Sequence, residues 1–178
     1  SIAARLIQQD VDALIIDRET RIGDNWRNRY HHLLLHNQTH VNHLPYMPFP
    51  SSWPTYIPKD KLAGWFKNYT ESMEINFWTK TEFSGATYNK KKERWSAIIK
   101  KNNSRIINIY PRHIVMATGV SGIPKLPNIS TLRLFEGPVI HSSKYKNGKN
   151  WKNKNTLVIG SGNSGHDIPQ DLYLNGAA

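Results

Sequence analysis

The feature that most constrains this chain is an apolar run near its C-terminal end that passes directly into closely spaced glycines. Thr156 to Ile159 reads Thr-Leu-Val-Ile, which has the length and the β-branched content of a buried parallel strand. The residues from Gly160 to Gly165 then follow the pattern Gly-x-Gly-x-x-Gly. A strand that feeds such a loop and then a helix predicts a Rossmann-type crossover unit.

Each glycine of this loop has its own expected role. Gly160 permits the tight turn out of the strand, Gly162 lets the backbone approach a pyrophosphate, and Gly165 lets the helix pack close to the strand. The phosphates would lie against the free N–H groups and the positive end of that helix. The predicted dinucleotide cradle consists of Gly160, Ser161, Gly162, Asn163, Ser164 and Gly165.

Two residues after the loop limit this prediction. Pro169 falls about two turns into the expected helix, where its ring and its missing N–H predict a kinked or short helix. The residue that reads the ribose 2′ position is expected ~20 residues past the loop, and the sequence ends at Ala178 before that point. The choice between NAD and NADP is therefore left open.

Length and composition set the class of protein. A chain of 178 residues suits one domain, or one and a half domains of a larger protein. The sequence has no apolar run of about 18 residues and no signal-peptide pattern, so we expect no transmembrane segment and a cytoplasmic location. Cysteine is absent, which excludes disulfides, thiolate metal sites and a dithiol reductase. We predict no metal site.

The net charge of +11 raises the alternative of a nucleic-acid-binding protein. The basic residues cluster at Lys90–Lys92, Lys100–Lys101 and Lys144–Lys154. Because these clusters fall in turn-like, Asn-rich segments without a known nucleic-acid module, we interpret them as solvated surface and expect no nucleic-acid partner.

The N-terminal segment has the order of half a crossover unit. Ser1 to Gln9 reads as a helix, and Ala13 to Ile16 reads as a short buried strand that Asp17 closes. If a glycine loop preceded Ser1, Asp17 would lie at about the distance of ~20 residues where a carboxylate holds the ribose hydroxyls. The alternative is an ordinary surface acid at a strand end.

The loop that follows is rich in functional residue types. Gly23 allows a special backbone conformation, Trp26 offers a flat apolar face, and Arg27 and Arg29 could reach phosphate. The proline- and aromatic-rich stretch from 44 to 54 cannot form a regular element, and we expect it to wrap over the core as ordered loop.

The middle of the chain predicts one helix and a small sheet. Pro58 to Ser72 reads as a helix with one apolar face. Strands are expected at 75–83, 87–89, 95–100 and 106–110, which together predict an antiparallel meander. His113 to Gly119 is then expected as a buried strand, and its small final residues would let a cofactor backbone pass close; these residues are Ala117, Thr118 and Gly119.

One further motif precedes the glycine loop. Phe135 to Tyr145 reads Phe-x-Gly-x-x-x-His-x-x-x-Tyr, with a turn expected at Gly137 and Pro138. His141 could be a hydrogen-bonding or a structural residue.

Taken together, these motifs resemble the flavin-containing monooxygenases, which belong to the class B flavoprotein monooxygenases with two dinucleotide-binding domains. The resemblance covers nearly the whole chain. Its most specific part is the Phe135 to Tyr145 motif just ahead of the glycine loop. The Gly-Asp-Asn-Trp sequence at Gly23 to Trp26 is similar to the fungal and plant-type branch.

The resemblance implies an α/β fold with two Rossmann-like domains, both incomplete, and a small antiparallel meander. Residues 1–150 would form a partial FAD-binding domain that lacks its first strand and glycine loop, and 151–178 would begin an NADPH-binding domain. Asp17 would hold the FAD adenosine ribose, and Ala117 to Gly119 would pass close to FAD. Gly23 and Trp26 would lie along the flavin. His141 and Tyr145 would link the domains and position the nicotinamide.

The implied reaction is oxygenation of a nitrogen- or sulfur-containing small molecule with NADPH and O₂, through a C4a-hydroperoxyflavin. The flavin carries this chemistry, so no side chain is assigned as catalytic. We expect the chain to be a fragment that is inactive by itself; the alternative is a catalytically inactive nucleotide-binding remnant. Substrate identity, Baeyer–Villiger chemistry and oligomeric state are left open.

Overall fold

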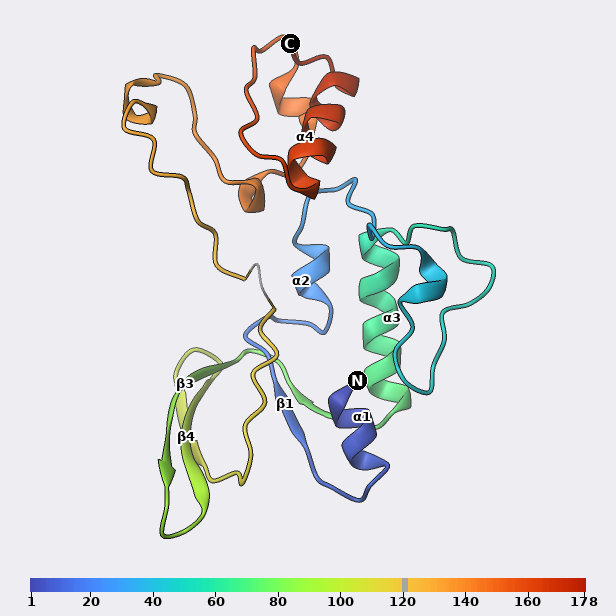
Figure 1. Ribbon diagram of the computed structural model, residues 1–178, viewed down its shortest axis with the longest axis vertical. Coiled ribbons are helices and arrows are strands. Elements are labelled where there is room, and N and C mark those ends of the chain that lie inside the picture. Colours follow the sequence, from blue (N-terminus) through green and yellow to red (C-terminus); the bar gives the residue numbers. More distant parts are fainter. Residues whose placement is uncertain (120–121) are drawn as a thin grey trace.

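The computed structural model describes residues 1–119 and 122–178, which form an elongated molecule (Figure 1). The strands lie toward one end, and the last helix, α4, lies at the other (Figure 1). The α-helices are α1 Ile2–Ile7, α2 Asp24–Arg27, α3 Lys59–Ser72 and α4 Asn163–Leu174. The 3-10 helices are η1 Thr39–Val41, η2 Leu132–Leu134, η3 Ser142–Lys144 and η4 Gly148–Trp151. The strands are β1 Leu14–Ile16, β2 Asn76–Trp78, β3 Thr81–Asn89, β4 Arg94–Lys101 and β5 Arg105–Ile109.

A parallel pair of strands organises the first half of the chain. β1 pairs with β2 in parallel, with Ile15 opposite Phe77. The predicted helix at Ser1 to Gln9 and the predicted strand at Ala13 to Ile16 are confirmed as α1 and β1. The two strands are joined by the long connection that contains α2, η1 and α3, and buried side chains of this connection pack against Ile15 of β1.

The main hydrophobic core lies on α3. Its predicted apolar face is confirmed, because Leu62, Trp65 and Tyr69 are all buried. Phe49 from the proline-rich stretch packs on Trp65, with ring centroids 4.5 Å apart, and stacks on Trp53 at 5.4 Å. The stretch is therefore an ordered loop over the core, as the sequence predicts.

The predicted antiparallel meander is confirmed as the three-stranded sheet β3-β4-β5. The strand expected at 87–89 is the end of β3, and the strand expected at 75–83 is divided into β2 and the start of β3. Lys80 lies between them with a φ of 49°. This left-handed conformation ends one strand and turns the chain into the second sheet.

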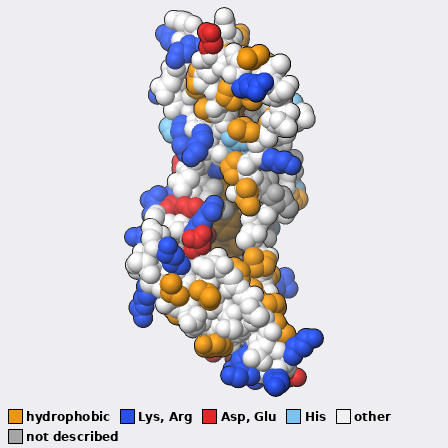
Figure 2. Space-filling model, turned by 90° about the vertical axis from the view of Figure 1, so that its left-hand side faces the viewer, with side chains coloured by type: hydrophobic (Ala, Val, Ile, Leu, Met, Phe, Trp, Pro, Cys, Tyr) orange, Lys and Arg blue, Asp and Glu red, His pale blue; other side chains and the backbone are white. Residues whose placement is uncertain are grey.

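The strand expected at His113 to Gly119 is not present, and that prediction is wrong. The segment belongs to no helix or strand and has no ladder partner among the described residues. Val115 and Met116 are therefore exposed, the latter to 63%. Apolar side chains of this kind appear on the molecular surface among scattered Lys and Arg side chains (Figure 2).

The prediction of a buried strand at Thr156 to Ile159 is also wrong in its burial and assignment. The run does not form a strand, and Leu157 is 84% exposed. Among the described residues only its start is paired, because the Thr156 N–H donates to the Ala178 carbonyl at 2.7 Å and the Ala178 N–H donates to the Lys154 carbonyl at 2.9 Å. This is the pattern of a parallel pair, so the chain after α4 returns beside the segment that enters the glycine loop.

α4 forms where the glycine loop predicts a helix. It begins at Asn163 and runs through Pro169 to Leu174 without ending at the proline. Ile168 and Leu172 on this helix pack with Tyr30 and Tyr145 in a second core. Burial of this face holds α4 against segments from both halves of the chain.

Candidate functional site

The glycine loop has a close backbone approach that only glycine permits. A Cβ on Gly165 would lie 2.3 Å from the carbonyl oxygen of Gly160, so no side chain fits at this position. Gly160 itself has a φ of 145°, which L side chains rarely adopt. Gly162 is the residue before α4 and has open space around it. The loop therefore presents exposed backbone directly ahead of a helix.

The N-terminal turn of α4 provides donors for an anion. The first N–H groups of any helix have no partner within the helix, and here they belong to residues beside the open Gly162. Ser161, Gly162 and Asn163 are exposed and Ser164 is half-buried. A twelve-residue helix adds the positive end of its dipole at the same place. The predicted cradle is therefore brought together as one continuous surface.

Side chains from the N-terminal half of the chain hold the start of α4. The Tyr30 hydroxyl donates to Asp167 Oδ2 at 2.6 Å, and His36 Nε2 lies 2.9 Å from the same oxygen. Burial, together with the hydrogen bond to the Asp167 carboxylate, raises the pKa of Tyr30 to about 12. Tyr30 therefore stays a neutral hydrogen-bond donor at physiological pH. The sequence predicted no role for His36, and it carries no local pattern that marks it.

Tyr145 is a buried residue that joins the loop after η3 to α4. Its hydroxyl donates to Asp171 Oδ2 at 2.6 Å, and the Gly148 N–H donates to the same oxygen at 2.8 Å. Burial and the bond to the carboxylate raise the pKa of Tyr145. Its ring meets Tyr30 edge-on, with centroids 6.3 Å apart. Tyr145 thus contacts residues from both predicted domains.

His141 does not share the contacts of Tyr145. Its Nδ1 accepts from the Ser143 N–H at 3.2 Å, which caps η3. The imidazole is half-buried. In the structure His141 thus has a local capping contact, and its expected role at the nicotinamide stays a prediction.

Asp17 follows β1 and keeps one carboxylate oxygen in a local bond. Oδ1 accepts from the Glu19 N–H at 2.9 Å. The backbone carbonyl of Asp17 accepts from Thr81 N–H at 2.9 Å, which fixes the strand end. The carboxylate therefore has a defined position at the end of a parallel strand, where a ribose-binding acid is expected.

Gly23, directly before α2, lies against Ala63 of α3. Its φ is 87°, and a Cβ there would lie 2.6 Å from the carbonyl oxygen of Ala63. Trp26 follows on α2 and packs against both hydrophobic cores. Arg27 donates to the Ile22 carbonyl at 2.6 Å and to Asp24 at 3.2 Å. Its guanidinium is therefore hydrogen-bonded within this loop, contrary to the expectation that it reaches phosphate.

Asp24 fixes this loop from within. It is buried and accepts bonds from Arg21, Thr20 and Arg27. Burial raises the pKa of Asp24, but the hydrogen bonds from these three side chains outweigh it and hold the pKa below its usual value. An ionised buried carboxylate with this many donors is a rigid structural centre.

The predicted small residues Ala117, Thr118 and Gly119 are exposed and lie outside any helix or strand. Gly119 has a φ of 73°, with open space where a Cβ would be. The backbone is accessible here, and its approach to a cofactor stays a prediction.

Among the residues from 1–119 and 122–178, no cluster of three or more His, Cys, Asp or Glu side chains has the arrangement of a metal site. Within the same ranges, none of the helices has the length and apolar character that crossing a membrane requires.

The parallel pair, the glycine loop that opens a helix and the antiparallel meander define a mixed α/β chain of the dinucleotide-binding class. The chain belongs to the flavin-binding monooxygenase-like family, whose model matches residues 16–177.

Curated relatives match nearly the whole chain. It is 30% identical over 174 residues to a protein of Arabidopsis thaliana named probable indole-3-pyruvate monooxygenase YUCCA10, which covers 97% of this chain and 45% of that protein. It is 32% identical to the Arabidopsis YUCCA4 protein, over 97% of this chain and 41% of that one. The chain thus spans less than half the length of these relatives.

Solved structures agree on the fold. A flavin-containing monooxygenase from Stenotrophomonas maltophilia superposes with a TM-score of 0.85 and 21% identity, over 98% of this chain and 51% of that one. A bacillithiol disulfide reductase from Bacillus cereus superposes with a TM-score of 0.82 and 15% identity, over 98% of this chain and 52% of that one. At these identities the likeness concerns the fold alone.

Proposed function

We propose that this chain is part of an FAD- and NADPH-dependent monooxygenase that oxygenates a small molecule. The observation that carries the proposal is the open glycine loop at the start of α4, in a chain whose family match extends over residues 16–177. The loop fits a dinucleotide because Gly165 allows the helix to approach the loop backbone closely, while the space around Gly162 is open.

Residues of this chain would hold the two cofactors in the following way. The backbone of Gly160 to Gly165 and the first turn of α4 would bind the NADPH pyrophosphate. Asp17 has one carboxylate oxygen engaged with Glu19, so the other could accept from the ribose hydroxyls of FAD. Trp26 and the backbone at Gly119 would lie along FAD. When bound, the flavin supplies electron transfer from NADPH and oxygen activation.

The substrate proposal has two forms. The family resemblance favours a molecule with a nucleophilic nitrogen or sulfur. The curated relatives carry the name indole-3-pyruvate monooxygenase, which adds indole-3-pyruvate as a second candidate. We further propose that residues 1–150 belong to the FAD-binding domain and residues 151–178 to the NADPH-binding domain. The proposed location is cytoplasmic, which a fluorescent fusion would test.

The experiment uses the full-length protein that contains this chain. Purified protein should be yellow, and it should consume NADPH and O₂ with formation of an oxygenated product from an amine, a sulfide or indole-3-pyruvate. Protein that stays colourless after incubation with FAD would refute the proposal. The rival proposal is a catalytically inactive nucleotide-binding remnant; it predicts that the protein binds NADP⁺ in calorimetry but gives no turnover.

A further inference from the structure

His36 makes two contacts with α4 that the proposed function does not use. Its Nε2 lies 2.9 Å from Asp167 Oδ2, and its Nδ1 lies within hydrogen-bond distance of Asn163 Nδ2. His36 belongs to the segment between α2 and η1, far from α4 in the sequence. One imidazole therefore bridges the N-terminal half of the chain to the helix that follows the glycine loop.

The two contacts involve both ring nitrogens of the imidazole. With the Asn163 amide nitrogen as donor, Nδ1 accepts, and Nε2 donates to the Asp167 carboxylate. Asn163 and Asp167 are four residues apart and lie on one face of α4. His36 thus spans the first two turns of the helix. The Tyr30 hydroxyl, which also comes from the N-terminal half of the chain, donates to Asp167 as well.

We propose that His36 is a positioning residue for dinucleotide binding, because its bonds to Asn163 and Asp167 hold the first two turns of α4 at the glycine loop. This inference rests on the proposed function. Asn163 contributes one of the free N–H groups that a pyrophosphate would meet. A helix start that is fixed before binding loses less entropy when the ligand arrives.

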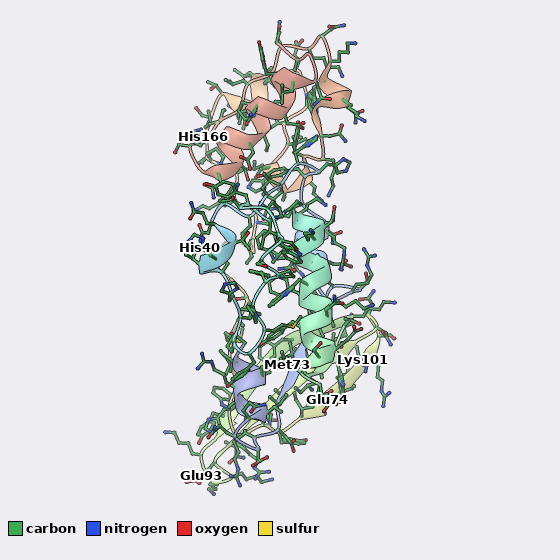
Figure 3. All side chains as sticks on the ribbon, turned by 90° about the vertical axis from the view of Figure 1, so that its right-hand side faces the viewer. His40, Met73, Glu74, Glu93, Lys101 and His166 are labelled. Atoms are coloured by element: carbon green, nitrogen blue, oxygen red, sulfur yellow. The ribbon has the colours of Figure 1, made fainter. Side chains whose placement is uncertain are left out.

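Two substitutions separate the two contacts. His36→Asn keeps an acceptor near the place of Nδ1 but removes the donor to Asp167. His36→Gln keeps a donor near the place of Nε2 but removes the acceptor for Asn163. His36→Ala removes both. The matched control is His40→Ala, since His40 is an exposed histidine of the same segment on η1 (Figure 3).

Two measurements are made on each variant: calorimetric titration with NADP⁺, and hydrogen–deuterium exchange over residues 163–171 without nucleotide. His36→Ala should weaken NADP⁺ binding by about fivefold to tenfold and speed exchange in this peptide, because two hydrogen bonds are lost. His36→Asn and His36→Gln should each weaken binding by about twofold to threefold. His40→Ala should change neither quantity.

The outcomes are distinguishable. Unchanged NADP⁺ affinity in His36→Ala, with a wild type that binds, overturns the positioning role and leaves the proposed function intact. A wild type that binds no NADP⁺ refutes the proposed nucleotide site, and the positioning role with it, even where exchange in α4 responds to the substitution.

Discussion

The contact between α2 and α3 gives a sharp test of the loop that carries Gly23. In Gly23→Ala the new methyl group would lie 2.6 Å from the Ala63 carbonyl oxygen and 2.9 Å from Ala63 Cα. Both atoms belong to the backbone of a helix, so a side chain cannot rotate away to make room. In addition, the φ of 87° forces an L residue into the left-handed region.

The free-energy cost of Gly23→Ala has two parts. The left-handed conformation costs an alanine about 1–2 kcal/mol relative to glycine. Overpacking against a helix backbone costs about 1–3 kcal/mol. We therefore expect Gly23→Ala to lower the free energy of unfolding by about 2–5 kcal/mol in urea denaturation followed by circular dichroism.

Gly64→Ala is the matched control, one residue along from Ala63. Gly64 lies within α3 and has nothing within 4 Å of its would-be Cβ. Alanine there should raise the free energy of unfolding by about 0.5–1 kcal/mol, because it favours the helix. A Gly23→Ala protein whose free energy of unfolding lies within about 0.5 kcal/mol of the wild type would refute the steric cost at Gly23. So would a shift of stability in the same direction by both substitutions.

Three further predictions concern the glycine loop and the buried carboxylates. Gly165→Ala should abolish calorimetric NADP⁺ binding, because its Cβ would lie 2.3 Å from the Gly160 carbonyl oxygen; wild-type affinity would contradict this. Asp24→Asn should lower the free energy of unfolding by about 2 kcal/mol at pH 7. Since the folded-state pKa of Asp24 is lowered, its stabilisation is present above the unfolded pKa and is lost as pH falls through the folded value. Urea titrations from pH 7 to pH 3 should therefore show that the difference in free energy of unfolding between Asp24→Asn and the wild type becomes smaller below about pH 4. A difference that does not change with pH would count against the assigned bonds. Tyr145→Phe should cost about 1.5–3 kcal/mol in the same assay, because the carboxylate of Asp171 loses a buried donor; a neutral result would show that this bond contributes little.

Local patterns were sufficient for much of the fold. The 3.6-residue spacing of Leu62, Trp65 and Tyr69 predicted α3 and its buried face. Alternating strands separated by Asn-rich turns predicted the meander. These elements depend on contacts between residues that are close in sequence, so the sequence carries their signal directly.

The two wrong strand predictions share one cause. His113–Gly119 and Thr156–Ile159 have the composition of buried strands, yet Met116 and Leu157 are exposed. A strand needs a hydrogen-bonded neighbour as well as apolar side chains. The composition of a segment indicates whether its side chains are apolar, but it does not indicate whether a hydrogen-bonded neighbour is present.

The sequence by itself determined at which positions the backbone must lack a side chain. Glycines at 23, 160 and 165 could be recognised from spacing, because a missing side chain is a local property that no distant contact supplies. Only the tertiary structure decided which side chains meet at the start of α4, where Tyr30 and His36 reach Asp167 across more than half of the chain. Such contacts depend on how whole elements pack, and no local sequence pattern predicts them.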